Sequence, residues 1–210
     1  MSDWSGANAT TLAAFEAAAT GFVELVATID GGWEAPGLGV WNLRALVGHT
    51  SRSLVTVTTY LDRPAGTEDL RTPAHYVAAT TEMAATDTEA VAERGRQAGR
   101  DLGADPAAVV ADLASAALAR VRAADPEDLL TTIGGGMRLR SYLPTRTFEL
   151  VVHGYDIADA VGIDVDPGEV ALAEATGVAA AVAVRLDHGV DLLRGLTGRG
   201  PWPEGFVVVR

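Results

Sequence analysis

The sequence predicts an all-helical fold, an antiparallel bundle of four principal helices with extra helical turns and a short C-terminal tail. Several segments place apolar residues at the spacing of one helix face. Most of these segments begin with a capping residue, often followed by proline. Apolar residues make up 48% of the 210 residues, enough for one well-buried domain. We expect the bundle to span residues 1–197 and the tail, a short strand or strap on the bundle, residues 198–210.

The first two helices are predicted from an apolar stripe and from capping residues. Asn8 or Thr10 can cap the first helix, whose stripe stops at Asp30, just before two glycines. Asn42 can cap the second helix, with a tryptophan before it able to pack on the first turn. We expect this second helix to end near Asp62, before a proline.

The next two helices each begin with a capping residue and a proline. Thr72 opens a third helix, rich in threonine and alanine, that we expect to break or kink around Asp87. Asp105 opens a further helix that runs to about Ala124, where an Asp-Pro pair ends it. Between the second and third helices we expect a polar linker, residues 63–71.

Residues 129–143 form the least helical part of the chain, because they contain three consecutive glycines. We predict a loop there, followed by a short extended piece at Met137 to Tyr142. The glycines do not form a phosphate loop, since no lysine follows and the GxxxxGK[ST] pattern is absent. The next helix is predicted to run from Pro144, which suits a first turn, to Gly162, which suits a left-handed C-terminal position.

A last long helix is predicted to start at Asp166 and to run to about Leu193 or Leu196. The tail that follows contains too many glycine and proline residues for a helix. Within it, we expect Phe206 to Val209 to form a short strand or an apolar strap.

Charge and composition exclude several kinds of function. The net charge is −12 and the pI is about 4.6, whereas nucleic-acid binding needs a basic surface. The sequence contains no cysteine, which excludes disulfides, thiolate zinc sites and a cysteine nucleophile. The N-terminus lacks the pattern of a signal peptide, and no window approaches about twenty uninterrupted apolar residues. We therefore expect a cytoplasmic protein that binds neither nucleic acid nor membranes.

One segment, PTRTFELVVHGYDIADAVG, carries a carboxylate and an imidazole four residues apart, Glu149 and His153. On a helix these side chains share a face and can bind one metal ion. A third ligand would come from another histidine. His49 lies in an apolar part of the second helix, where an imidazole needs a hydrogen bond or a metal. His75 and His188 are expected at the surface or at helix caps. Taken alone, however, His49 is more often an ordinary core histidine, and such Glu/His pairs also arise by chance.

Two stretches together resemble the mycothiol-dependent maleylpyruvate isomerase family, which belongs to the DinB-like superfamily of four-helix metal-binding proteins. They are WNLRALVGHTSRSL at residues 41–54 and RTFELVVHGYDIADAVG at residues 146–162. The family's metal motif is a histidine on the second helix and a Glu-x-x-x-His pair on a later helix. The resemblance therefore implies a DinB-like four-helix bundle with His49, Glu149 and His153 as metal ligands.

The resemblance covers most of the chain, from Trp33 to Gly162, and the closing LTGRGPWPEGF is also similar. Full-length maleylpyruvate isomerases carry a further small α/β domain after the bundle, which supplies part of the substrate site. Here the final helix and a short tail occupy that region. The resemblance thus implies the metal chemistry of the family but not the particular substrate of the named enzyme.

Two imidazoles and one carboxylate leave an open coordination position, as in catalytic zinc sites. Zinc is the first choice, and nickel, iron or manganese would fit the same ligands. A divalent ion lowers the pKa of a bound water or thiol, and the resemblance implies mycothiol as that thiol. We therefore predict a metal- and thiol-dependent transferase or isomerase acting on a small electrophile, and a homodimer is compatible with this. The alternatives are a metal-binding DinB-like protein without catalysis, a metal-dependent hydrolase and a purely structural bundle.

Helical spacing places several further side chains near the predicted ligands. Asp156, three residues after the second ligand histidine, either accepts the second N–H of that imidazole or forms an ordinary salt bridge. Arg52 and Arg146 would bind an anionic substrate or neutralise Glu149, and the neutralising role is favoured. Trp41 would line a pocket or pack in the core, and the core role is favoured.

Overall fold

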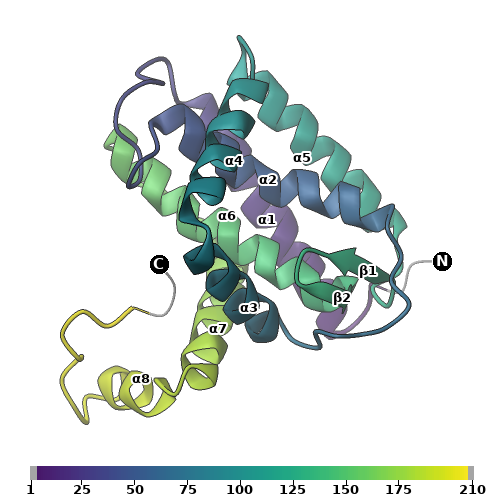
Figure 1. Ribbon diagram of the computed structural model, residues 1–210, viewed down its shortest axis with the longest axis vertical. Helices are drawn as coiled ribbons and strands as arrows, with labels where there is room; N and C mark the ends of the chain where they lie inside the picture. Colours follow the sequence, from purple (N-terminus) through teal and green to yellow (C-terminus); the bar gives the residue numbers. More distant parts are fainter. Residues whose placement is uncertain (1–3, 208–210) are drawn as a thin grey trace.

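The computed structural model of the protein describes residues 4–207 and confirms the all-α prediction (Figure 1). Helices form most of the described chain, and the strands within it make one short hairpin. In chain order the elements are α1 (Ala7–Ala27), α2 (Leu43–Leu61), α3 (Pro73–Thr86), α4 (Thr88–Asp101), α5 (Pro106–Ala123), β1 (Leu129–Thr132), β2 (Gly135–Arg138), α6 (Leu139–Val161), α7 (Glu169–Arg185) and α8 (Gly189–Leu196).

The core forms where α1, α2, α5 and α6 pack together. α2 contacts α4, α5 and α6, while α1 contacts α5, α6 and α7. In Figure 1, α6 passes through the middle of the molecule, and α8 lies at the lower edge, beyond the end of α7. Large side chains with almost no exposed surface fill the centre, among them Phe15, Leu46, Leu54, Tyr142 and Ile157. Two of the helices that meet in this core, α2 and α6, also carry the predicted metal ligands.

By length and composition alone, α1 is apolar enough to cross a membrane. The same test accepts α4 and α5 together, as one span bent by 103°. In the folded chain, however, α1 packs against three other helices. Its buried residues are Ala14, Phe15, Ala18, Ala19, Phe22, Leu25 and Val26. Core helices also pass this test, so the fold accounts for the apolar character of α1.

Three of the predicted helix starts, those of α2, α3 and α5, are confirmed together with their capping hydrogen bonds. The helix predicted to start at Asp166 begins instead at Glu169, as α7, with no side-chain cap. The side chain of Asn42 accepts a hydrogen bond from the backbone N–H of Ala45 at 2.9 Å, at the start of α2. Thr72 caps α3 and Asp105 caps α5, in each case just before a proline. The predicted break at Asp87 is also observed, since this residue ends α3 and its side chain caps α4.

The first helix begins earlier than predicted. α1 starts at Ala7, preceded by Gly6, so neither Asn8 nor Thr10 is its capping residue. The backbone N–H of Asn8 already donates to the carbonyl of Ser5 at 3.1 Å. Because backbone carbonyls accept from the first turn, this helix start does not require a side-chain cap.

The three glycines contribute to a β-hairpin rather than to a loop alone. β1 and β2 pair antiparallel, with Leu130 opposite Met137. Gly136, in β2, lies against the linker that precedes α3, and a Cβ atom there would overlap the carbonyl oxygen of Thr67. The need for glycine therefore comes from a residue far away in the chain, which is why local sequence reasoning predicted a loop.

α6 begins at Leu139, so the prediction that Met137 to Tyr142 is extended is wrong for its C-terminal part. Pro144 consequently lies inside the helix rather than in its first turn. The backbone N–H of Leu139 donates to the carbonyl of Asp128 at 2.8 Å, which satisfies one donor of the early first turn. The predicted end is confirmed, since Gly162 has a φ of 75° and terminates the helix in the left-handed conformation.

The last predicted helix is divided into α7 and α8. Asp187, between them, has a φ of 63°, a left-handed conformation that non-glycine residues seldom adopt. This turn interrupts the helix within the range that the apolar pattern predicted as continuous. Of the predicted strand or strap, Phe206 and Val207 form no strand. Val208 and Val209 lie outside the described residues.

Candidate metal centre

The three predicted ligands lie together where α2 and α6 pack. α2 carries His49, and α6 carries Glu149 and His153 one turn apart. Their ligand atoms, two imidazole nitrogens and a carboxylate oxygen, all lie within 4.8 Å of one another. Among residues 4–207, this is the one group of three histidine or acidic side chains that comes so close. The packing of two helices thus converts distant parts of the sequence into one potential metal site.

His153 is held between two carboxylates. Its Nε2 atom lies 3.4 Å from Oε2 of Glu149, and its Nδ1 atom lies 2.8 Å from Oδ2 of Asp156. Burial alone would lower the pKa of His153, but hydrogen bonds to the two carboxylates raise it to about 9. Asp156 therefore makes the contact with the second imidazole nitrogen that its spacing suggested. Nε2 remains the nitrogen that faces Glu149.

Glu149 is a largely buried carboxylate that stays ionised. Burial alone would raise its pKa, but the hydrogen bond from His153 and the positive charge of Arg146 lower it to about 2. Its side chain keeps 26% of its surface exposed, so the carboxylate is still within reach of solvent. An ionised carboxylate at neutral pH is ready to act as a ligand for a divalent cation.

His49 has the opposite protonation behaviour. Burial lowers its pKa to about 4, and the nearby charge of His153 contributes in the same direction. The imidazole is therefore neutral at neutral pH, the form in which histidine binds metals. Its Nδ1 atom is buried and has no hydrogen-bond partner among the described residues. The rings of His49 and His153 meet edge to face, with centroids 5.0 Å apart.

Arg146 lies one turn before Glu149 on α6 and is 8% exposed. Its guanidinium is placed over the rings of Tyr76 and Tyr142, 5.2 and 4.9 Å from their centroids. Its Nε donates to the hydroxyl of Thr145 at 3.0 Å. Because its charge lowers the pKa of Glu149, Arg146 has the electrostatic effect expected of a neutralising residue.

Sequence reasoning did not identify the two tyrosines around this arginine. Tyr142 is four residues before Arg146, so helical spacing would have placed it there if α6 had been predicted to begin at Leu139. Tyr76 belongs to α3. No local pattern connects it to α6, and only the packing of the helices shows the contact.

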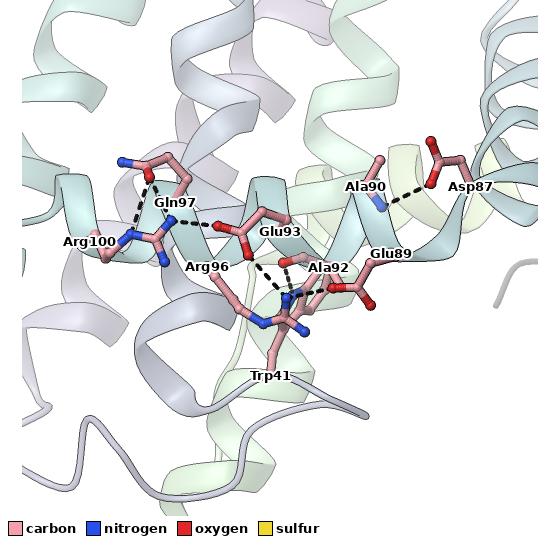
Figure 2. Close-up of polar contacts among 9 residues, drawn as sticks. All are labelled: Trp41, Asp87, Glu89, Ala90, Ala92, Glu93, Arg96, Gln97 and Arg100. Carbon is pink, nitrogen blue, oxygen red and sulfur yellow. Dashed lines mark hydrogen bonds and ion pairs between the residues drawn. The ribbon is translucent and has the colours of Figure 1, made fainter.

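Trp41 belongs both to the core and to the site. It is half-buried and packs against the core cluster, as the sequence analysis favoured. At the same time its ring lies 4.4 Å from the ring of His49, with 31° between the two planes. Figure 2 shows its indole N–H donating to the carbonyl of Ala92 on α4, at 2.9 Å.

The other candidate residues lie at different distances from the cluster. Arg52, one turn after His49 on α2, is near enough for its charge to lower the pKa of that histidine. His75 lies in the first turn of α3. His188 precedes α8, and its ring packs on Phe206 with centroids 5.8 Å apart. The last two histidines are therefore not part of the group of three.

The residues present fit a divalent metal ion. A neutral imidazole, an ionised carboxylate and a second imidazole form the donor set of open, catalytic zinc sites. His153 is protonated at neutral pH, so a metal ion would have to displace the proton on its Nε2 atom.

Comparison with known protein families points in the same direction. The family model described as the mycothiol maleylpyruvate isomerase N-terminal domain matches residues 9–158. No curated protein and no solved structure matches the chain. The family match extends from α1 to within four residues of the end of α6 and includes all three residues of the group. Because it covers more than half of the sequence, the protein belongs to the mycothiol maleylpyruvate isomerase N-terminal domain family, whose fold is a DinB-like helical bundle.

Proposed function

We propose that His49, Glu149 and His153 bind one divalent cation, most readily zinc, with nickel, iron or manganese as alternatives for the same ligands. The observation that carries this proposal is the approach of the three ligand atoms to within 4.8 Å. The pKa values of about 4 for His49 and about 2 for Glu149 support it, because both groups are ready to coordinate at neutral pH.

We further propose that the protein is a metal- and thiol-dependent transferase or isomerase, in which mycothiol adds to a small electrophile. Membership of the family supports mycothiol as the thiol. When bound at such a site, a divalent ion lowers the pKa of a thiol at its open position and makes a nucleophile available near neutral pH. Because the sequence contains no cysteine, the thiol has to come from outside the chain.

Three neighbouring side chains would prepare the ligands for this role. Asp156 fixes the ring of His153 through Nδ1 and so leaves Nε2 directed at Glu149. Arg146 helps to keep that carboxylate ionised. Arg52 adds positive charge beside the cluster, which would favour an electrophile that carries an anionic group.

We place the metal-binding bundle in residues 1–197 and assign residues 198–210 to a tail that supplies no ligand. The proposed location is the cytoplasm, with small molecules rather than nucleic acids or membranes as partners. The net charge of −12 supports the exclusion of nucleic acids. A homodimer is compatible with this assignment.

The metal site is tested by elemental analysis and zinc titration of the purified protein. We expect about one ion per chain, with binding abolished or strongly weakened in His49→Ala. His188→Ala is the matched control and should bind as tightly as the wild type. Less than about a tenth of an equivalent of metal per chain after reconstitution, or unchanged zinc affinity in His49→Ala, would rule out the proposed site.

The reaction is tested with mycothiol and a small α,β-unsaturated electrophile. We expect thiol-dependent consumption of the electrophile, loss of the activity on chelation and its return when zinc is added. Turnover with water and no thiol would instead indicate the hydrolase. Tight metal binding without either activity across a panel of electrophiles would indicate a metal-binding protein without catalysis.

A further inference from the structure

The two imidazoles of the metal centre are supported in different ways. The Nδ1 atom of His153 lies 2.8 Å from a carboxylate oxygen of Asp156, and this contact fixes the orientation of the ring. His49 has no equivalent support, because its Nδ1 atom is buried without a hydrogen-bond partner in the described chain. A ligand ring that no hydrogen bond orients needs another constraint if it is to present one fixed nitrogen.

Trp41 is the side chain that can provide this constraint. Its ring lies against the imidazole of His49, with centroids 4.4 Å apart and planes inclined by 31°. This arrangement is close to offset stacking, which restricts rotation of the smaller ring because rotation would drive its edge into the indole. The ring of His153 meets the imidazole edge to face at 5.0 Å. His49 is thus held by two aromatic contacts.

The indole is itself fixed on α4. Its N–H donates to the backbone carbonyl of Ala92 at 2.9 Å, as Figure 2 shows. One turn further along α4, Gly95 leaves the space that the ring occupies, since a Cβ atom there would lie 2.6 Å from the indole Cε2 and Nε1 atoms. The hydrogen bond and the missing side chain together set both the position and the tilt of Trp41.

α4 is in turn held close to the helix that carries the ligand. Gly48, the residue before His49, faces Gly99 so closely that a Cβ atom at either glycine would meet backbone atoms of the opposite helix. On the exposed face of α4, Arg96 and Arg100 pair with Glu93 at 3.1 and 2.6 Å (Figure 2). α4 therefore forms a fixed support beside the metal centre although it contributes none of the three candidate ligands.

We propose that Trp41 is the positioning residue of His49: anchored to α4 through Ala92 and Gly95, its indole holds the imidazole in the orientation that binds the metal. The stacking of Trp41 on His49 has the same orienting effect as the hydrogen bond between Asp156 and His153. This inference rests on the proposed metal site, and it extends the metal centre to α4.

The first test is zinc affinity in variants of the indole. Loss of an outer support of a metal ligand typically weakens binding by about 10- to 100-fold, and we expect an increase of this size in Kd for Trp41→Leu. Trp41→Phe keeps an aromatic face but loses the hydrogen bond to Ala92, so its Kd should lie between those of the wild type and Trp41→Leu. Gly95→Ala should also weaken binding, because it displaces the indole without changing any residue that contacts His49. Trp33→Phe, in the same loop, is the control and should have no effect.

The second test uses metal-free protein, so it does not depend on the proposed function. The ring current of Trp41 should shift the NMR signals of the His49 ring protons in the wild type, and Trp41→Leu should remove this shift. Circular dichroism verifies that the variants are folded. If the wild type binds no zinc, the proposed function fails, while the ring signals still decide whether Trp41 packs on His49 in solution. Unchanged ring signals, or unchanged zinc affinity in Trp41→Leu, would overturn the positioning role.

Discussion

The two candidate ligand histidines have pKa values on opposite sides of neutrality. Burial lowers the pKa of His49 to about 4, whereas the carboxylates of Glu149 and Asp156 overcome burial and raise the pKa of His153 to about 9. Before a metal binds, one imidazole is therefore neutral, and the other is protonated on both nitrogens, with Nδ1 facing Asp156 and Nε2 facing Glu149. The site thus provides one imidazole that can bind a metal directly and one that first has to lose a proton.

Zinc binding should therefore release about one proton per ion at pH 7.5. The proton comes from His153, because His49 and Glu149 are already deprotonated at this pH. Apparent zinc affinity should rise about tenfold per pH unit up to pH 9 and then level off, since the competing proton is lost there.

Calorimetric titration in buffers of different ionisation enthalpy measures the number of protons released. Asp156→Asn serves as the comparison, because loss of its charge lowers the pKa of His153 and should reduce the proton release. Zinc binding that neither takes up nor releases protons would show that His153 is neutral in the free protein.

Glu174 provides a pH-dependent effect on stability away from the metal centre. Burial raises its pKa, against the opposing effect of hydrogen bonds with Thr147 and Thr11, and its Oε2 atom is buried without a partner in the described chain. Because the pKa of this acid is higher in the folded state than in the unfolded state, the carboxyl destabilises the fold above its ordinary pKa. Stability is lost as the pH rises through the shifted value.

We expect Glu174→Gln to raise the melting temperature at pH 7.5, and the difference should largely disappear at pH 4, where the carboxyl is protonated in both states. Thermal unfolding at the two pH values measures this. Glu24→Gln, at an exposed position of α1, is the control and should show no such pH dependence. An equal effect of Glu174→Gln at both pH values would contradict the role of its charge.

At the scale of the elements, the close approach of α2 and α4 depends on glycine. A side chain at Gly48 would overlap the backbone of Gly99, so Gly48→Ala has to separate the two helices. We expect a loss of about 1–3 kcal/mol in the free energy of unfolding, measured by urea denaturation. Gly177→Ala, at an exposed site on α7 with no atom within 4 Å of the added Cβ, should be neutral or stabilising by up to about 1 kcal/mol. Equal stability of the two variants would contradict the tight contact.

Local signals were sufficient for the helices whose ends are set by their own residues. Asn42, Thr72 and Asp105 cap the helices that they were predicted to start, since the cap hydrogen bond forms within one turn. The hairpin could not be predicted in this way, because Gly136 is required by the distant Thr67. The turn at Asp187 was also missed, since the residue in the left-handed conformation is an aspartate and the nearby Gly189 begins the next helix.

The residues of the candidate site were likewise predicted only where a local pattern connects them. The spacing of Glu149 and His153 on one helix was visible in the sequence, and the contact of Asp156 with the second histidine follows from the same helix. By contrast, the placement of Tyr76 over Arg146 depends on how α3 packs against α6, which no local pattern specifies. Residues within one turn of a ligand on the same helix were predicted. Tyr142, in the part of α6 that was not predicted to be helical, and Tyr76, on a neighbouring helix, were not.

At the scale of the whole molecule, α8 and the tail are the part least attached to the bundle. α8 buries none of its residues and packs on α7. Its apolar residues Val190, Leu193 and Leu196 are 70, 63 and 69% exposed. The described tail folds back on it, with Trp202 packed against Gly195 and the ring of Phe206 against that of His188.

Removal of residues 187–210 should therefore leave the metal centre and the fold of the bundle intact. We expect the same zinc stoichiometry and a melting temperature within a few degrees of the full chain, a shift of roughly 1 kcal/mol or less. Removing the exposed apolar residues of α8 should also reduce any self-association, measured by sedimentation. Leu193→Asp in the full chain is the comparison and should reduce association without shortening the protein. Loss of cooperative unfolding in the truncated chain would show that the tail is an integral part of the bundle.

The three candidate ligands all belong to α2 and α6, and none to a loop or to the hairpin. The proposed cation site therefore depends on the connecting segments only through Trp41, which lies in the segment before α2. Natural variation or laboratory grafting can therefore rebuild the other segments, and with them the preference for a reactant, without changing the residues proposed to hold the ion.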